Sequence, residues 1–183
     1  MPIFGSAEDL FGSFNTTVAS FYDVYAGKRC AELARQHVRD LFDIRELIRN
    51  KGIDRKLFDT FLIYFVGQQR PIVDLLQPIK NPIESSLLSN LNNLAFQKVT
   101  ADDLIQARDS LIRIVHHILT AKDREFLLSV KRIKPDWSLT DNPGVERPPA
   151  VTFKLMNLGR MSEHRHRAAV NKLRRVLDSI VGG

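Results

Sequence analysis

The sequence predicts a mainly α-helical, multi-helix domain with one short strand near its N-terminus. Apolar residues recur at helical spacing through most of the chain, a pattern typical of amphipathic helices that share a core. Ser, Thr and Asp precede these runs, and Gly or Pro follows several of them, as helix caps and helix ends require. The chain has 183 residues, 44% of them hydrophobic, which is enough for one domain with a substantial core.

The N-terminal region divides into an irregular segment and a pair of helices. Residues 1–20 lack helical spacing and contain the predicted short strand, at 14–19. The first helix is predicted over 21–34, with Ser20 as its N-cap. A second helix follows it, and the two together are predicted to form a motif-bearing unit over 21–53.

The rest of the chain, 54–183, is predicted to form a C-terminal helical domain. Gly52 ends the helix pair as a C-cap, and a start signal then precedes each later helix. These signals are Asp54, the capping-box pairs Thr100 with Asp103 and Thr120 with Asp123, Pro148 with Pro149, and Ser162. Between the first two of them, three prolines punctuate a predicted segment of short helices or turns, which ends at 85–93 and is interpreted as a mobile connection.

Composition and charge limit the functional classes. The net charge of +6 favours acidic partners such as nucleic acid, but an excess of this size is also common among soluble proteins. The single cysteine, Cys30, excludes an internal disulfide and indicates a reducing compartment. We interpret it as a packing residue. The sequence shows no signal-peptide pattern and no apolar run long enough to span a bilayer, so we expect a cytoplasmic protein without a membrane partner.

Charged residues stand where the two N-terminal helices should be apolar. At about 100° per residue, Asp40 and Asp43 fall on the border of the apolar arc of the second helix, and Lys28 falls within the apolar stripe of the first. The stripe contains Phe21, Val24, Tyr25 and Ala31, and the arc contains Leu41, Ile44, Leu47 and Ile48. If the helices face each other, a buried lysine gains the partners that it needs, and a polar site for phosphate oxygens or a metal ion results. Its residues are Lys28, Arg39, Asp40 and Asp43.

The same residues also allow a purely structural interpretation. Asp40 can cap the second helix, with Asp43 at the third helical position in a weak capping box. Lys28 can run along the surface and place its amine in water. Because helix caps are far commoner than active sites, the spacing by itself favours this alternative.

The same residues resemble a known motif. A lysine, a spacer and Arg-Asp-x-x-Asp at the start of a helix are similar to the third motif of the AbiE-type (AbiEii/AbiGii) toxin nucleotidyltransferases, a branch of the polymerase-β-like superfamily. Here the motif is Lys28 and 39–43, with further similarity at 35–37, 69–72 and 123–158. The resemblance is to the C-terminal helical part of these enzymes and spans most of the chain.

The resemblance implies nucleotidyl transfer from an NTP with Mg²⁺, in some members onto RNA such as tRNA. It implies a toxin–antitoxin system of abortive infection, a phage defence, with a cognate antitoxin protein as partner. By the same resemblance, Lys28 binds the triphosphate, Arg39 supports phosphate or the loop, and one carboxylate helps to activate the acceptor hydroxyl. Either Asp40 or Asp43 fits that last role.

One feature departs from the family pattern. Members hold two metal ions through a Gly-Ser segment, an Asp-x-Asp and a further acidic residue, and this sequence contains no Asp-x-Asp. Gly5 and Ser6 are followed closely only by Asp9, in a segment that does not alternate like a strand. Nucleotidyl transfer needs Mg²⁺ held by carboxylates. We therefore expect a truncated chain, the C-terminal portion of a longer enzyme, that is inactive or impaired alone.

A different functional class is a non-enzymatic helical module that binds RNA or a protein. Its candidate surface is the basic final helix, which carries Arg165, Arg167, Lys172, Arg174 and Arg175. Such side chains either contact RNA phosphates or form a solvated outer face. Trp137 beside Lys131 and Lys134 offers a base-stacking platform, although a lone tryptophan next to a proline is more often a packing anchor.

Overall fold

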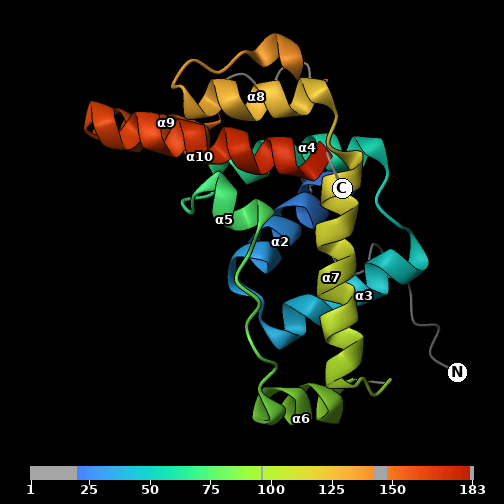
Figure 1. Cartoon of the computed structure of the whole chain (residues 1–183). Helices are drawn as coiled ribbons and strands as arrows, with labels where there is room; N and C mark the ends of the chain where they lie inside the picture. Colours follow the sequence, from blue (N-terminus) through green and yellow to red (C-terminus); the bar gives the residue numbers. More distant parts are fainter. Residues whose placement is uncertain (1–19, 96, 142–147, 182–183) are drawn as a thin grey trace, which may run out of the picture.

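The computed structural model describes residues 20–95, 97–141 and 148–181. Within these ranges the chain forms nine α-helices and one 3₁₀ turn, with no strand (Figure 1). The prediction of a mainly helical, multi-helix fold is confirmed. The predicted N-terminal strand and the Gly-Ser segment lie outside the described residues.

The first two helices, α2 (Phe21–Arg35) and α3 (Val38–Asn50), have the predicted signals at their ends. The Ser20 hydroxyl accepts a hydrogen bond from the backbone N–H of Asp23 at 3.1 Å, so it caps α2. After α3, Gly52 has a φ of +69°, and its N–H donates to a carbonyl of the last turn at 3.0 Å. This left-handed residue closes the helix, as a C-cap glycine does.

Helix α4 (Arg55–Gly67) is almost entirely apolar and lies in the core. Asp54 caps it by accepting a hydrogen bond from the N–H three residues later, at 2.8 Å. Phe58, Phe61 and Phe65 follow one another along the helix, with ring centroids 5.6 and 5.3 Å apart. Helix α2 packs along α4, so α4 supports the helix that carries Lys28.

The segment predicted to be a mobile connection, 85–93, is instead a helix, α6 (Ser85–Leu94). Three of its leucines are half-buried against the core. The Asn92 side-chain amide donates to the carbonyl of Val99 at 2.9 Å and accepts from its N–H at 2.8 Å. The helix is held by packing on α3 and by this bridge, neither of which a local pattern reveals.

Capping boxes begin the next two helices as predicted. In α7 (Ala101–Ile118) and α8 (Ala121–Lys131), a threonine N-cap and the aspartate three residues later bond reciprocally. The chain then forms the 3₁₀ turn Trp137–Leu139, α9 (Pro149–Gly159) and α10 (Glu163–Val181). None of the helices among the described residues is long and apolar enough to cross a membrane.

Figure 1 shows α8, α9 and α10 gathered at one end of the molecule and α6 at the opposite end. Helix α10 packs on α8 and on the short helix α5 (Ile72–Leu76). Trp137 packs on Phe126, with ring centroids 5.5 Å apart, as a packing anchor does. Lys131 is buried, so it is not an exposed cation for the predicted stacking platform. The division at residues 53 and 54 stays a prediction.

Candidate functional site

The lysine and one aspartate of the predicted motif meet between α2 and α3. Lys28 Nζ lies 2.7 Å from Asp43 Oδ2, and the two side chains are 53% and 38% exposed. They line a groove of about 230 Å³. The other residues of the groove are Tyr25, Glu46, Leu47, Asn50 and Lys51. An amine and a carboxylate are therefore presented to solvent in a small concave site.

Contrary to the prediction, Lys28 does not lie in the buried face of α2. The buried side chains of that helix include Ala26, Cys30 and Leu33, whereas Val24 is 46% exposed. Small side chains let α2 approach α4 closely, and Cys30 Sγ lies 3.6 Å from a backbone carbonyl of α4. The helix is thus turned so that Lys28 faces outward. Cys30 is a packing residue, as predicted.

The other two motif residues lie apart from this pair. Asp40 is in the first turn of α3 and pairs with Arg35 at 3.6 Å, outside the described lining of the groove. Arg39 is exposed. The N-cap of α3 is His37, whose Nδ1 accepts from the Arg39 N–H at 3.3 Å, so the alternative in which Asp40 caps the helix is wrong. The structure brings together only half of the predicted four-residue site.

A buried polar cluster holds the turn between α2 and α3. Gln36 is 8% exposed and has a φ of +53°, which non-glycine residues rarely adopt. Its amide donates to the Ile79 carbonyl at 2.7 Å and accepts from the Asn81 N–H at 3.1 Å. Arg108 donates to the same amide oxygen at 3.2 Å and to the Asn81 carbonyl at 2.6 Å. These bonds fix where α3 begins, and so where Asp43 lies.

Sequence reasoning missed this cluster, although Arg108 carried a signal. It stands in the apolar stripe of α7 between Leu104 and Leu111, where a buried arginine needs polar partners. Its partner Gln36 is 72 positions away in the sequence. Spacing along α7 can therefore reveal the need for a partner but not its identity.

A second ion pair that contains an aspartate joins α4 to α8, and its aspartate is buried rather than exposed. Arg55 donates two hydrogen bonds to Asp123, at 2.8 and 2.7 Å, and the Asp123 side chain is 1% exposed. Burial raises the pKa of Asp123, but hydrogen bonds from Arg55 and Thr120 and the Arg55 charge together outweigh burial. The pKa of Asp123 is therefore below its ordinary value. This pair fixes two helices and presents no carboxylate to a ligand.

The described residues do not fit a resident magnesium ion. That part of the chain contains no group of three or more His, Cys, Asp or Glu side chains that could hold a metal. In the groove, Asp43 is paired with Lys28 at 2.7 Å and Glu46 with Arg45 at 2.6 Å. Because Mg²⁺ requires a near-octahedral set of oxygen ligands, these two engaged carboxylates are an insufficient donor set.

The basic residues of the predicted RNA-binding surface are all exposed on α10. At about 100° per residue, Arg165 and Lys172 share one flank of the helix and Arg167 and Arg174 share the other. Arg175 lies between the flanks, and Arg167 is paired with a neighbouring glutamate at 2.5 Å. The charges therefore surround the outer face of α10 and do not form a single stripe.

Comparison with known families gives a match over the region that contains the Lys28–Asp43 pair. The sequence matches the family described as nucleotidyl transferase AbiEii toxin, type IV TA system, over residues 1–140. The chain belongs to the AbiEii toxin family. The resemblance inferred from Lys28 and 39–43 is confirmed, and membership in this AbiEii family implies a nucleotide substrate and an antitoxin partner. No curated protein and no solved structure gives a significant match.

The AbiEii match covers some of the structural features described above and leaves others out. It contains α2 to α8, and so the groove and the Gln36 cluster. Helices α9 and α10 lie beyond it, together with the part of the predicted resemblance that falls after residue 140. The basic surface of α10 therefore gains no support from the AbiEii match.

Proposed function

We propose that this AbiEii chain takes part in transferring a nucleotide from an NTP to an acceptor hydroxyl, with cleavage of the α–β phosphoanhydride bond and release of pyrophosphate. We propose further that the groove between α2 and α3 binds the NTP phosphates. The observation that carries the proposal is the 2.7 Å contact between Lys28 and Asp43. It joins the two ends of the family motif in a groove that is open to solvent. A half-exposed lysine amine can reach phosphate oxygens as a point charge.

The Lys28–Asp43 pair supplies a phosphate-binding cation and a carboxylate in direct contact. Arriving phosphates compete with Asp43 for the Lys28 amine, because the two negative groups repel each other. Once the amine binds phosphate, the Asp43 carboxylate is available to accept a proton from the acceptor hydroxyl. Arg39, exposed in the first turn of α3, supports the phosphates or the loop, and Asp40 is the second candidate for the base.

The groove accounts for only part of a nucleotide site. Its volume of about 230 Å³ is below the range of roughly 300–1,000 Å³ that is typical of small-molecule pockets, so it fits phosphates better than a whole nucleotide. The sequence also lacks the Asp-x-Asp of the family pattern. We therefore infer that these residues form one half of the site and that the chain is inactive or strongly impaired alone. Mg²⁺ belongs to the reaction of the intact family enzyme.

A second function, RNA binding by α10, is favoured by its five exposed basic side chains. Contacts of such residues with phosphates set affinity rather than sequence preference. In an AbiEii toxin this helix would hold an RNA acceptor such as tRNA, and in a non-enzymatic module it would be the main functional surface. Titration with labelled tRNA tests this function. Arg174→Ala with Arg175→Ala should weaken binding, whereas Lys28→Ala should not.

Calorimetric titration of the full chain with Mg²⁺ and each NTP tests the phosphate groove. Lys28→Ala should weaken NTP binding at least about tenfold, because a charge-assisted contact is lost. Lys80→Ala is the matched control, since Lys80 is 55% exposed and pairs with Asp109 at 3.0 Å. Absence of NTP binding by the wild type would contradict the proposal, as would equal affinities of wild type and Lys28→Ala.

A further inference from the structure

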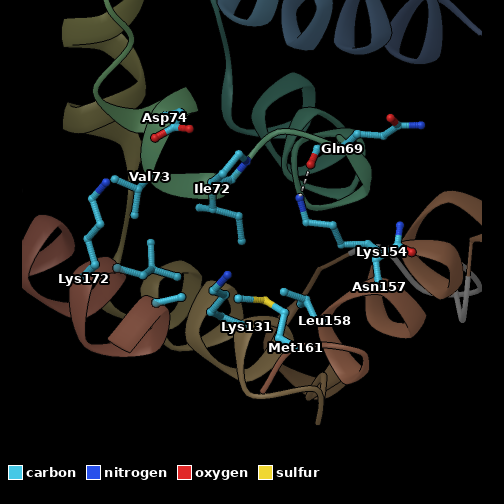
Figure 2. Close-up of a pocket in the computed structure, with 13 residues that line it drawn as sticks. Gln69, Ile72, Val73, Asp74, Lys131, Lys154, Asn157, Leu158, Met161 and Lys172 are labelled. Carbon is cyan, nitrogen blue, oxygen red and sulfur yellow. Dashed lines mark hydrogen bonds between the residues drawn. The ribbon is translucent and has the colours of Figure 1, made fainter. Parts of the chain in front are cut away.

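A second cavity, of about 400 Å³, lies between α5, α8, α9 and α10 (Figure 2). Much of its wall is apolar, from Ile72, Val73, Leu158, Met161 and Leu173. Its charged residues are Lys131, Lys154, Lys172 and Asp74. The cavity therefore combines an apolar surface with a cluster of positive charge, a combination that the phosphate groove does not use.

Lys131, the last residue of α8, is the unusual member of this cluster. Its side chain is 7% exposed, and its amine has no hydrogen-bond or ion-pair partner among the described residues. Figure 2 shows the side chain directed into the cavity. Burial lowers the pKa of Lys131, and the charge of Asp74 opposes that change only in part. A largely buried amine that faces a cavity without a hydrogen-bond partner is a candidate to bind an anion from solution.

Lys154 lines the same cavity, but its amine already has hydrogen-bond partners within the protein. It is also 7% exposed, but its amine donates to the carbonyls of Gln68, Gln69 and Arg70, at 2.5, 3.2 and 2.5 Å. These carbonyls follow the C-terminal end of α4, a position where a positive charge is also favoured by the helix dipole. Its hydrogen bonds are used by the protein itself, which leaves Lys131 and Lys172 to meet a ligand.

We propose that this cavity binds a small phosphate monoester with an apolar body, about the size of a mononucleotide. Lys131 and Lys172 contact the phosphate, and the apolar body lies on Val73, Met161 and Leu173. The polar side chains of Gln69 and Asn157, which also line the cavity, can hydrogen-bond the polar atoms of that body.

Charge and size both favour a phosphate monoester. With its lysines protonated, the cavity carries three positive charges against the one negative charge of Asp74. A phosphate monoester carries about −1.5 to −2 at neutral pH, which matches this excess, whereas a carboxylate would neutralise only half of it. The volume of about 400 Å³ lies within the range of roughly 300–1,000 Å³ that is typical of small-molecule pockets.

The inference does not rest on the proposed function of the α2–α3 groove. The two sites share no lining residue, and two of the four helices around this cavity, α9 and α10, lie beyond the family match. A probe that binds here should therefore bind equally well to a chain in which the groove has been altered.

Calorimetric titration of the full chain with AMP, inorganic phosphate and adenosine tests the proposal. We expect one saturable AMP site, weaker binding of phosphate, and no binding of adenosine. Lys131→Met should weaken AMP binding at least about tenfold, because a charge-assisted contact is lost. The matched control is Lys122→Met on the same helix, since Lys122 is 42% exposed and pairs with Asp141. Lys28→Ala should leave AMP binding at this site unchanged.

Two results would overturn the inference. The first is absence of saturable AMP binding by the wild type, and the second is an affinity in Lys131→Met equal to that in Lys122→Met. Should Lys131→Met fail to fold, Lys172→Gln keeps the test decisive, because Lys172 is exposed. That variant should bind AMP several-fold more weakly, about threefold to tenfold, and an unchanged affinity contradicts the proposal.

Discussion

Two ion pairs of equal length have different roles in this protein. Lys28–Asp43 and Arg55–Asp123 both contact at 2.7 Å, but Asp43 is 38% exposed and Asp123 is 1% exposed. Water screens the first pair, so it contributes at most about 1 kcal/mol to stability. If the second pair loses Arg55, the Asp123 carboxylate is left buried without its counter-charge. Burial, and not distance, separates the pair that holds helices together from the pair that can meet a ligand.

The largest expected effect comes from breaking the buried pair. Arg55→Met should lower the free energy of unfolding by about 3–5 kcal/mol, because Asp123 stays buried without its counter-charge. Urea denaturation measures this loss. Because the pair holds the pKa of Asp123 below its ordinary value, its contribution is present above the unfolded-state pKa and is lost as the pH falls through the folded-state pKa.

The control for that prediction is an exposed pair whose lysine lies on α8, the helix that carries Asp123. Lys122 and Asp141 contact at 2.7 Å and are 42% and 59% exposed, so Lys122→Met should change the free energy of unfolding by less than about 1 kcal/mol. The comparison fails if Arg55→Met and Lys122→Met destabilise the protein equally.

Lys154 extends the comparison to a third case, because its amine is buried but hydrogen-bonded to carbonyls instead of paired with a counter-charge. Lys154→Met should lower the free energy of unfolding by about 2 kcal/mol near pH 7, since three carbonyls lose their donor. Burial and the charge of Lys131 lower the pKa of Lys154 to about 8, from an ordinary 10.5. Between these values the folded chain has released a proton that the unfolded chain still holds, so wild-type stability rises with pH.

Urea denaturation at several pH values between 7 and 10.5 tests whether wild-type stability rises with pH. The difference in unfolding free energy between wild type and Lys154→Met should grow as the pH rises through this window. Parallel pH profiles for the two proteins would show that the Lys154 proton is not linked to folding.

The smallest expected effect on stability comes from breaking the exposed pair. Lys28→Ala should change the free energy of unfolding by less than about 1 kcal/mol, because both side chains are already hydrated. The same urea denaturation measures this change. The matched control is Lys80→Ala, which breaks the surface pair Lys80–Asp109. A loss of several kcal/mol would make Lys28–Asp43 a structural pair like Arg55–Asp123.

Local sequence signals predicted most of the helices. Thr100 with Asp103 and Thr120 with Asp123 form the expected capping boxes, and Asp54 caps α4. Such signals work because an N-cap side chain and the backbone N–H from which it accepts lie three residues apart. The family resemblance, carried by Lys28 and 39–43, was likewise readable from a short ordered pattern.

Contacts between distant segments were not predictable in the same way. The outward rotation of Lys28 follows from close packing of α2 on α4, and Gln36 is held by residues more than forty positions away. The carbonyl partners of Lys154 lie 84–86 positions back along the chain. Helical spacing shows which residues share a face, but tertiary packing decides whether that face is buried.

The affinity of Asp43→Asn for NTP, measured by calorimetry, tests the central claim most directly. If phosphates displace Asp43 from Lys28, a neutral asparagine removes both a competitor and a repelling charge. Asp43→Asn should then bind NTP about threefold to tenfold more tightly than wild type, in the opposite direction to Lys28→Ala. An affinity equal to or weaker than that of wild type would contradict the claim that Lys28–Asp43 is a binding pair.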